Sequence, residues 1–191
     1  MSKVRFVFKS MVLAMTGMVL VYLGVGQILV DDWRIDTTRV LQASPVEVAA
    51  FVQDLGTWSK WSSTDANLGP PTVRTVAGER GAKGYGITWT GPQGRAMLVV
   101  TGGGADAMEY EFIGQGPDDT EPRSRSRGHI EWVAEGAGCR VLWRDEGSWG
   151  STVGRWFGWF GALQERLREV QGASLQGLQQ AIEAARRAAG K

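Results

Sequence analysis

The pattern of hydrophobic and polar positions separates an uninterrupted apolar segment near the N-terminus from a longer part with regular periodicity. The apolar segment, residues 10–30, contains no charged side chain. A helix of that length rises about 31 Å, which matches the hydrocarbon thickness of a bilayer. Three basic side chains precede the segment and two acidic ones follow it: Lys3, Arg5, Lys9, Asp31 and Asp32.

These flanks predict an orientation, because basic residues stay preferentially on the cytoplasmic side. Residues 1–9 are expected to form a cytoplasmic tail, and residues 10–30 a single-pass transmembrane signal anchor of the plasma (inner) membrane. The rest of the chain would then lie on the extracytoplasmic side. One alternative is a cleaved signal peptide, but its apolar run is normally shorter and no cleavage site is obvious near Gly26. The other is a buried core helix, which is normally shorter and amphipathic.

Beyond the apolar segment, the pattern changes first to the two-residue period of a strand and then to a short helix. Apolar and polar side chains alternate over residues 33–38. Ser44 can cap a helix that starts with Pro45, and Glu47 stands where a capping box requires an acidic residue. The helix should end near Asp54. Two tryptophans follow it: Trp58 and Trp61.

The middle of the chain, residues 71–149, has the pattern of successive antiparallel strands joined by short turns. The clearest turn is Gly-Pro-Gln-Gly at residues 91–94. Apolar side chains occupy every second position along each segment, and this alternation predicts one common apolar face. Its main members are Tyr85, Ile87, Trp89, Met97, Val99, Met108, Tyr110, Phe112, Ile130, Trp132, Cys139, Val141 and Trp143.

The last segment, from residue 151 to about 189, changes to the period of an amphipathic helix. A single long helix is expected, with a bend near Gly172 and Gly177. Its apolar stripe includes Val153, Trp156, Phe160, Leu163, Leu167, Val170, Ser174, Leu178 and Ile182. The order of elements therefore predicts an α+β domain that ends in a long helix.

Composition narrows the classes of partner. The net charge of +1 provides no basic field for nucleic acid, so no nucleic-acid partner is predicted. Cys139 is the only cysteine, so no intramolecular disulfide is possible. Nine tryptophans and six phenylalanines are ample material for an apolar core or an aromatic-lined pocket.

The order of these elements, together with several short motifs, resembles the START-like (SRPBCC) superfamily and, within it, the polyketide cyclase/dehydrase-like group. The motifs are SPVEVAAFVQD after the first strand, Asp-x-x-x-Trp-x-x-Trp at 54–61, GITWTG at 86–91, GCRVLW at 138–143 and the long C-terminal helix. The resemblance covers residues 33–185 and predicts a START-like domain at 33–191. The superfamily binds sterols, lipids, hormones, quinones and polyketides on one scaffold, so the resemblance does not name a ligand.

The resemblance implies a helix-grip fold. In this fold an antiparallel sheet curves around the long C-terminal helix, two short helices follow the first strand, and an elongated hydrophobic cavity remains. Trp58 and Trp61 would stand at the end of the cavity, either as plugs of the core or in contact with a ligand. The predicted ligand-binding residues are Trp58, Trp61, Trp89, Met97, Tyr110, Phe112, Trp132, Val141, Trp143, Asp145, Trp156 and Phe160.

Candidates for catalysis are few. His129, the only histidine, alternates with the apolar positions of its strand and should face solvent. Cys139 should face the core and behave as a small hydrophobe. Asp145 continues an inward face and is the best candidate for an ionisable group near the cavity mouth, where a carboxylate can have a raised pKa. The preferred interpretation is nevertheless a solvated Asp at the end of its strand. No catalytic residue, metal site or cofactor is predicted.

The preferred function is non-catalytic binding of a hydrophobic small molecule, such as a lipid, a quinone or a polyketide-like aromatic, by a membrane-anchored domain. One alternative is an enzyme resembling polyketide cyclases, which two or more titratable groups converging in the cavity would favour. Another is a protein-interaction module, which a filled core would favour. The sequence names neither the ligand nor the oligomeric state.

Overall fold

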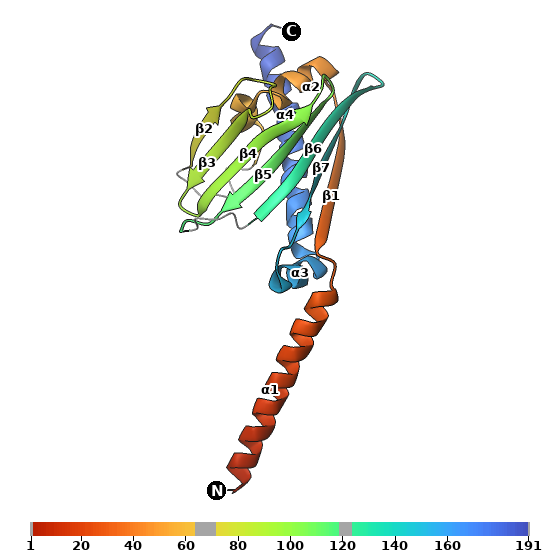
Figure 1. The fold of residues 1–191 in the computed structure, drawn as a ribbon. Coiled ribbons are helices and arrows are strands. Elements are labelled where there is room, and N and C mark those ends of the chain that lie inside the picture. The colour runs from red at the N-terminus through yellow and green to blue at the C-terminus, as the bar shows by residue number, and fades with distance from the viewer. Residues whose placement is uncertain (1, 64–71, 119–123, 191) are drawn as a thin grey trace.

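The computed structural model describes residues 2–63, 72–118 and 124–190, which form an apolar N-terminal helix and an α+β domain (Figure 1). The helices are α1 (Ser2–Ile28), α2 (Pro45–Val52), the 3-10 helix η1 (Leu55–Lys60), α3 (Thr152–Trp159) and α4 (Ala162–Ala188). The strands are β1 (Asp32–Leu41), β2 (Val73–Ala77), β3 (Gly86–Gly91), β4 (Gly94–Gly103), β5 (Ala107–Gln115), β6 (Ser124–Glu135) and β7 (Gly138–Ser148).

The seven strands of the described residues form one antiparallel sheet in the order β1-β7-β6-β5-β4-β3-β2. Strands β2 to β7 pair with their neighbours in sequence, whereas β1 pairs with the last strand. The sheet curves, α4 lies along its inner face, and α2 covers the end far from α1 (Figure 1). The predicted helix-grip fold, with two short helices after the first strand, is confirmed.

The start of α2 is fixed by the predicted capping box. Ser44 Oγ accepts a hydrogen bond from Glu47 N (3.4 Å), and Ser44 N donates to Glu47 Oε2 (2.8 Å). Arg186 of α4 donates two further hydrogen bonds of 2.7 Å to the same carboxylate. These bonds, that from Arg186 foremost, lower the pKa of Glu47 to about 2. The carboxylate therefore stays charged and ties α2 to the end of α4.

The C-terminal segment forms two helices where one was predicted. Gly161 has a φ of 73°, in the left-handed region that favours glycine, and separates α3 from α4. The helix α4 is uninterrupted at Gly172 and Gly177, where a bend was expected. A Cβ at Gly177 would come within 2.4 Å of the backbone oxygen of Trp61, so this glycine allows η1 to pack closely against α4.

Most of the predicted apolar face forms the buried core, but β4 departs from it. The turn after β3 pairs Gly91 with Gly94, and this register sets Ala96 opposite the buried Trp89. Ala96 then faces the core, and Met97 points to the other face of the sheet. The prediction that Met97 and Val99 share the inward face was wrong, because the register across the turn decides which alternate positions face inward.

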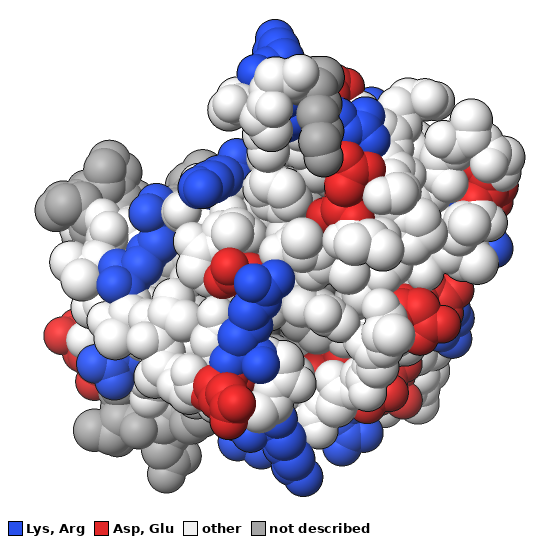
Figure 2. Space-filling view, turned by 90° about the horizontal axis from the view of Figure 1, so that it is seen from above, with Lys and Arg blue, Asp and Glu red and all other residues white. Residues whose placement is uncertain are grey.

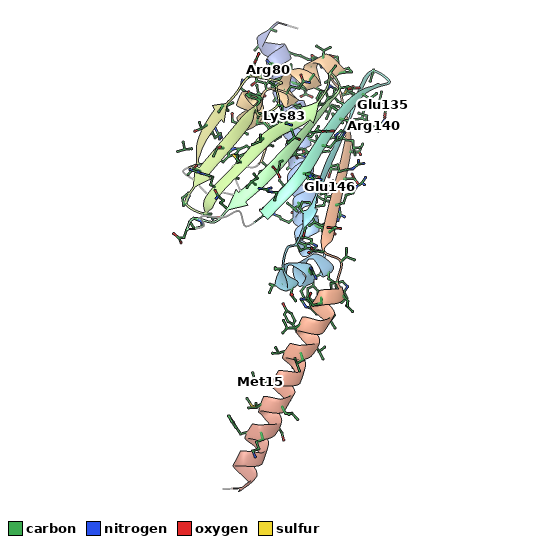
Figure 3. The ribbon with its side chains drawn as sticks, in the orientation of Figure 1. Met15, Arg80, Lys83, Glu135, Arg140 and Glu146 are labelled. Carbon is green, nitrogen blue, oxygen red and sulfur yellow. The ribbon has the colours of Figure 1, made fainter. Side chains whose placement is uncertain are left out.

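The helix α1 begins before the predicted apolar segment and ends at Ile28. Its stretch Phe8–Ile28, with a mean hydropathy of 1.9, is long and apolar enough to cross a bilayer by length and composition. Side chains along it are exposed, and Met15, about midway along the helix, lies well away from the α+β domain (Figure 3).

Candidate functional site

A cavity of about 480 Å³ lies between the inner face of the sheet and the first half of α4. Aromatic rings from η1, β5 and β7 border it, and Leu167 and Val170 of α4 face them. Polar groups of Asp145, Gln171 and Ser174 also reach the cavity. It is thus an apolar pocket with a few polar positions, which is the usual composition of a small-molecule site.

The predicted ligand-binding residues divide into three groups. Those that line the cavity are Trp58, Tyr110, Phe112, Trp143 and Asp145. Those that are buried in the core but do not line the cavity are Trp61, Trp89, Trp132 and Val141. Those that lie elsewhere are Met97, Trp156 and Phe160. Alternation along β5 and β7 therefore located one wall of the cavity correctly.

The two tryptophans after α2 form an aromatic cluster at the inner end of the cavity. The ring centroids of Trp58 and Trp61 are 4.7 Å apart, and each lies 6.0 Å from that of Trp143. The indole N–H of Trp58 donates to the backbone oxygen of Val52 (2.9 Å), which satisfies this buried donor. Trp58 presents its ring to the cavity, whereas Trp61 packs behind it against α4.

Asp145 is the centre of a hydrogen-bonded chain inside the cavity. Tyr110 OH donates to Asp145 Oδ1 (2.6 Å), and Trp143 Nε1 donates to the same tyrosine oxygen (2.7 Å). From the other side, Gln171 Nε2 donates to Asp145 Oδ2 (2.7 Å). Thr37 of β1 donates in turn to Gln171 Oε1 (2.6 Å). The chain links β1, β5, β7 and α4, and it holds the carboxylate in one orientation.

Burial dominates the electrostatics of this chain. Removal from water raises the pKa of Asp145, although its hydrogen bonds from Tyr110 and Gln171 act in the opposite direction. Burial, followed by the charge of Asp145, raises the pKa of Tyr110 well above its usual range. Tyr110 therefore remains a hydrogen-bond donor at neutral pH. Of the two interpretations offered for Asp145, the geometry agrees with the cavity-facing carboxyl of raised pKa and not with the preferred solvated one.

Asp145 is expected to make the protein less stable as the pH rises. A carboxyl whose pKa is raised by folding binds its proton more tightly in the folded state, so stability falls as pH rises from about 3.9 toward the raised value. The melting temperature of Asp145→Asn minus that of the wild type should therefore increase between pH 4 and pH 7. Asp106→Asn, the same substitution at an exposed position, is the matched control. A difference for Asp145→Asn that is constant or falls with pH would contradict the raised pKa.

Trp156 and Phe160 were predicted to close the cavity from the long helix. Trp156 lies in α3, Phe160 directly follows this helix, and both lie outside the cavity. Trp156 stacks on Tyr22 of α1 with ring centroids 5.2 Å apart and donates to the Tyr22 backbone oxygen (3.1 Å). Phe160 is 69% exposed. The prediction was wrong because the break at Gly161 takes α3 out of line with α4, and apolar spacing continues across the break.

Sequence reasoning did not assign the cavity residues of β1 and α4. Leu167, Val170 and Ser174 were visible as members of the apolar stripe, and that signal could have placed them in the cavity wall. Trp33 of β1 also lines the cavity. Gln171 is only 3% exposed, and no local pattern marks a buried glutamine that bonds to a distant strand.

The predictions for the histidine and the cysteine agree with the structure. His129 is partly exposed on the outer face, with Nε2 3.4 Å from Glu131 and Nδ1 4.0 Å from Glu109. Cys139 is buried, and burial raises the pKa of its thiol. Within the described part of the chain, no group of three or more His, Cys, Asp or Glu side chains is placed to hold a metal ion.

The exposed lining residues mark the mouth of the cavity. They are Gln93, Arg95, Ser124 and Arg166. The strand pairing shows at which end of the sheet this rim lies. The start of β4 pairs with the end of β5, which pairs with the start of β6. The start of β6 in turn pairs with the end of β7, which pairs with the start of β1. The mouth therefore lies at the end of the domain that is joined to α1, which is called the α1 end below (Figure 1).

Comparisons with protein-family profiles and with curated proteins find no match. Solved structures do match. The Aha1 dimer from Colwellia psychrerythraea has a TM-score of 0.54 and 15% identity, covering 79% of this chain and 96% of that chain. Ara h 8.0201 has a TM-score of 0.54 and 10% identity, covering 80% and 99%. DynU16, a putative protein in the dynemicin biosynthetic locus, has a TM-score of 0.55 and 11% identity, covering 80% and 48%.

At these identities the likeness is one of fold. The sheet, the long C-terminal helix and the short helices at one end define a helix-grip fold. This chain combines such a domain with an apolar N-terminal helix and with a cavity between the sheet and α4.

Proposed function

We propose that the protein binds a hydrophobic small molecule in this cavity without chemically changing it. The observation that carries the proposal is the cavity of about 480 Å³, walled by aromatic and aliphatic side chains and containing few polar groups. Such a space suits a lipid chain, a quinone or a polyketide-like aromatic, whose transfer from water is driven by the hydrophobic effect. The open volume also counts against an interaction module with a filled core.

The ligand can be sought by mass spectrometry of organic extracts from the purified full-length protein. We expect a hydrophobic compound in a stoichiometric amount. Candidate lipids, quinones and aromatic polyketides should then raise the melting temperature, because a ligand that binds only the folded state stabilises it by mass action. If extracts contain no such compound and no member of the panel shifts the melting temperature, the binding proposal fails.

We also propose that α1 anchors the domain in the plasma (inner) membrane with the N-terminus in the cytoplasm. The apolar stretch Phe8–Ile28 supports the span, and the basic residues before it support the orientation. A C-terminal fusion to a reporter that is active only outside the cytoplasm should give signal. A silent fusion that is expressed normally would reverse the orientation, and release of the domain from the membrane by signal peptidase would exclude the anchor.

A second candidate is an acid–base enzyme of the polyketide cyclase kind. Asp145 and Tyr110 favour it, because they are two titratable groups that converge in the cavity at 2.6 Å. Incubation with aromatic polyketide precursors, followed by chromatography and mass spectrometry, separates the candidates. A binder returns the compound unchanged, whereas an enzyme converts it in an Asp145-dependent manner, so that Asp145→Asn retains binding and loses turnover.

A further inference from the structure

The helix α3 exposes an apolar surface that the domain does not cover. Val153, Trp159 and Phe160 are 53%, 64% and 69% exposed. Outside α1, Trp159 and Phe160 are the only strongly exposed aromatic side chains among the side chains that the structure describes. The opposite end of the domain differs, because acidic and basic side chains are interspersed over it (Figure 2). Exposed aromatic side chains in one patch indicate a surface with a partner.

The same helix packs directly against the last turns of α1. A Cβ at Gly26 would come within 2.3 Å of the Thr152 methyl group, so the glycine is required for this close approach. Gln27 Nε2 donates to Thr152 Oγ1 (3.2 Å). Tyr22 contributes its stacked ring and its backbone oxygen to Trp156. The exposed aromatic residues of α3 are therefore continuous with the apolar surface of α1.

Asp31 fixes the orientation of α1 relative to the domain. Its carboxylate accepts hydrogen bonds from Arg155 Nε of α3 (3.1 Å), Ser148 Oγ of β7 (2.7 Å) and Gly150 N (3.2 Å). Arg155 also donates to the backbone oxygen of Gln27 (3.2 Å), which has no partner within α1 because the helix ends there. These bonds join α1, β1, β7 and α3 at one point.

The depth of this contact corresponds to a membrane interface. Tyr22 precedes the end of α1 by six residues, or about 9 Å along the helix axis. If Phe8–Ile28 spans the hydrocarbon layer, Tyr22 lies about 9 Å inside the end of that layer. The apolar face of an interfacial helix is buried about 5–10 Å at the boundary between headgroups and acyl chains, so α3 beside Tyr22 lies at a depth that such helices reach. Tryptophan and phenylalanine are favoured at that depth in interfacial helices.

The mouth of the cavity lies at this same α1 end of the domain. Two basic residues stand at its rim: Arg95, an exposed residue near the start of β4, and Arg166 of α4, which also pairs with Glu169 (3.2 Å). Behind the rim the wall is apolar, with Phe112 and Leu167. An opening with cationic groups outside and an apolar interior is complementary to an anionic amphiphile with an acyl chain.

We propose that α3 is an interfacial membrane helix that holds the cavity mouth against the bilayer, so that an anionic phospholipid enters from the membrane with an acyl chain first. The phosphate then lies beside Arg95 and Arg166, and the chain occupies the cavity. This deepens the proposed binding function and rests on it and on the proposed anchor. The route spares the acyl chain from crossing bulk water, which costs about 0.8 kcal/mol for each CH₂ group exposed.

The position of α3 can be tested on the full-length protein in phosphatidylcholine/phosphatidylglycerol nanodiscs. In a Cys139→Ser background, nitroxide labels are placed on Phe160→Cys and, as a control at the opposite end, on the exposed Val46→Cys. Power saturation should show the label at 160 relaxed mainly by oxygen and the label at 46 mainly by a water-soluble nickel complex. Equal access of the nickel complex to both positions would place α3 in water and overturn the proposal.

The entry route can be tested with a phosphatidylglycerol that carries a diazirine in one acyl chain. After irradiation of the nanodiscs, mass spectrometry should find the lipid attached to cavity residues of β5 and α4, and Trp159→Ser/Phe160→Ser should reduce this labelling several-fold. A short-chain diazirine fatty acid added from water distinguishes the proposed entry from the membrane from the proposed binding in the cavity. If it labels the cavity and the bilayer lipid does not, the membrane route is wrong while the binding function stands. If neither labels the cavity, the phospholipid proposal is wrong, and the binding function then depends on the quinone and polyketide members of the panel.

Discussion

Replacing Trp132 with alanine is expected to lower the free energy of unfolding by about 3–5 kcal/mol, because the ring is removed from a packed core. Trp132 is 1% exposed and does not line the cavity, so the mutation leaves a new void that cannot collapse easily. A domain of this size has a stability of about 5–15 kcal/mol, so the loss is a large fraction of the total. Urea unfolding followed by circular dichroism measures it.

Two further tryptophans make this a graded series. Trp143 is 6% exposed and borders the cavity, so Trp143→Ala enlarges an existing space and should cost about 1–2 kcal/mol less than Trp132→Ala. Trp159 is 64% exposed, and Trp159→Ala should change the stability by less than about 0.5 kcal/mol. If Trp143→Ala costs as much as Trp132→Ala, the region around Trp143 is packed and the cavity is not an open site.

Filling the cavity should abolish binding while leaving the fold intact. Val170 faces the cavity from α4, so Val170→Trp directs a large ring into the space that a ligand would occupy. A compound present at a hundred times its Kd stabilises the wild type by about 2.7 kcal/mol, and a hundredfold weaker Kd leaves about 0.4 kcal/mol. The panel compound that stabilises the wild type most should therefore give almost no shift in the melting temperature of the variant.

The matched control for this variant is Arg168→Trp, which adds a similar ring at an exposed position of the same helix. It should retain the ligand-induced shift of the wild type. Binding by Val170→Trp at wild-type affinity would mean that the ligand lies outside the cavity. Loss of binding in both variants would mean that the effect arises from the helix rather than from the filled space.

Local sequence signals predicted much of the secondary structure of the domain. The capping box of Ser44 and Glu47 lies within four residues and forms as expected, because all of its partners are neighbours in the chain. Alternation along β5 and β7 placed Tyr110, Trp143 and Asp145 on the inward face for the same reason, since successive side chains of a strand point to opposite sides.

The resemblance to helix-grip proteins supplied the arrangement of these elements, but it did not supply contacts. Met97 was assigned to the wrong face because the pairing of β3 with β4 depends on the turn between them. Trp156 and Phe160 were assigned to the cavity because the apolar periodicity continues across Gly161. The positive φ of Gly161 nevertheless separates α3 from α4, so the two helices do not share one apolar face.

By itself, the sequence determined the features that depend on residues close together along the chain: the apolar helix, the strands, the capped helix and the inward position of Asp145. Only the tertiary structure decided which distant groups meet. The bond between Gln171 and Asp145, the contact of Trp156 with Tyr22 and the position of the cavity mouth at the α1 end each join segments separated by many residues. These contacts depend on the strand register and on the positive φ of Gly161, and neither produces a periodic pattern in the sequence.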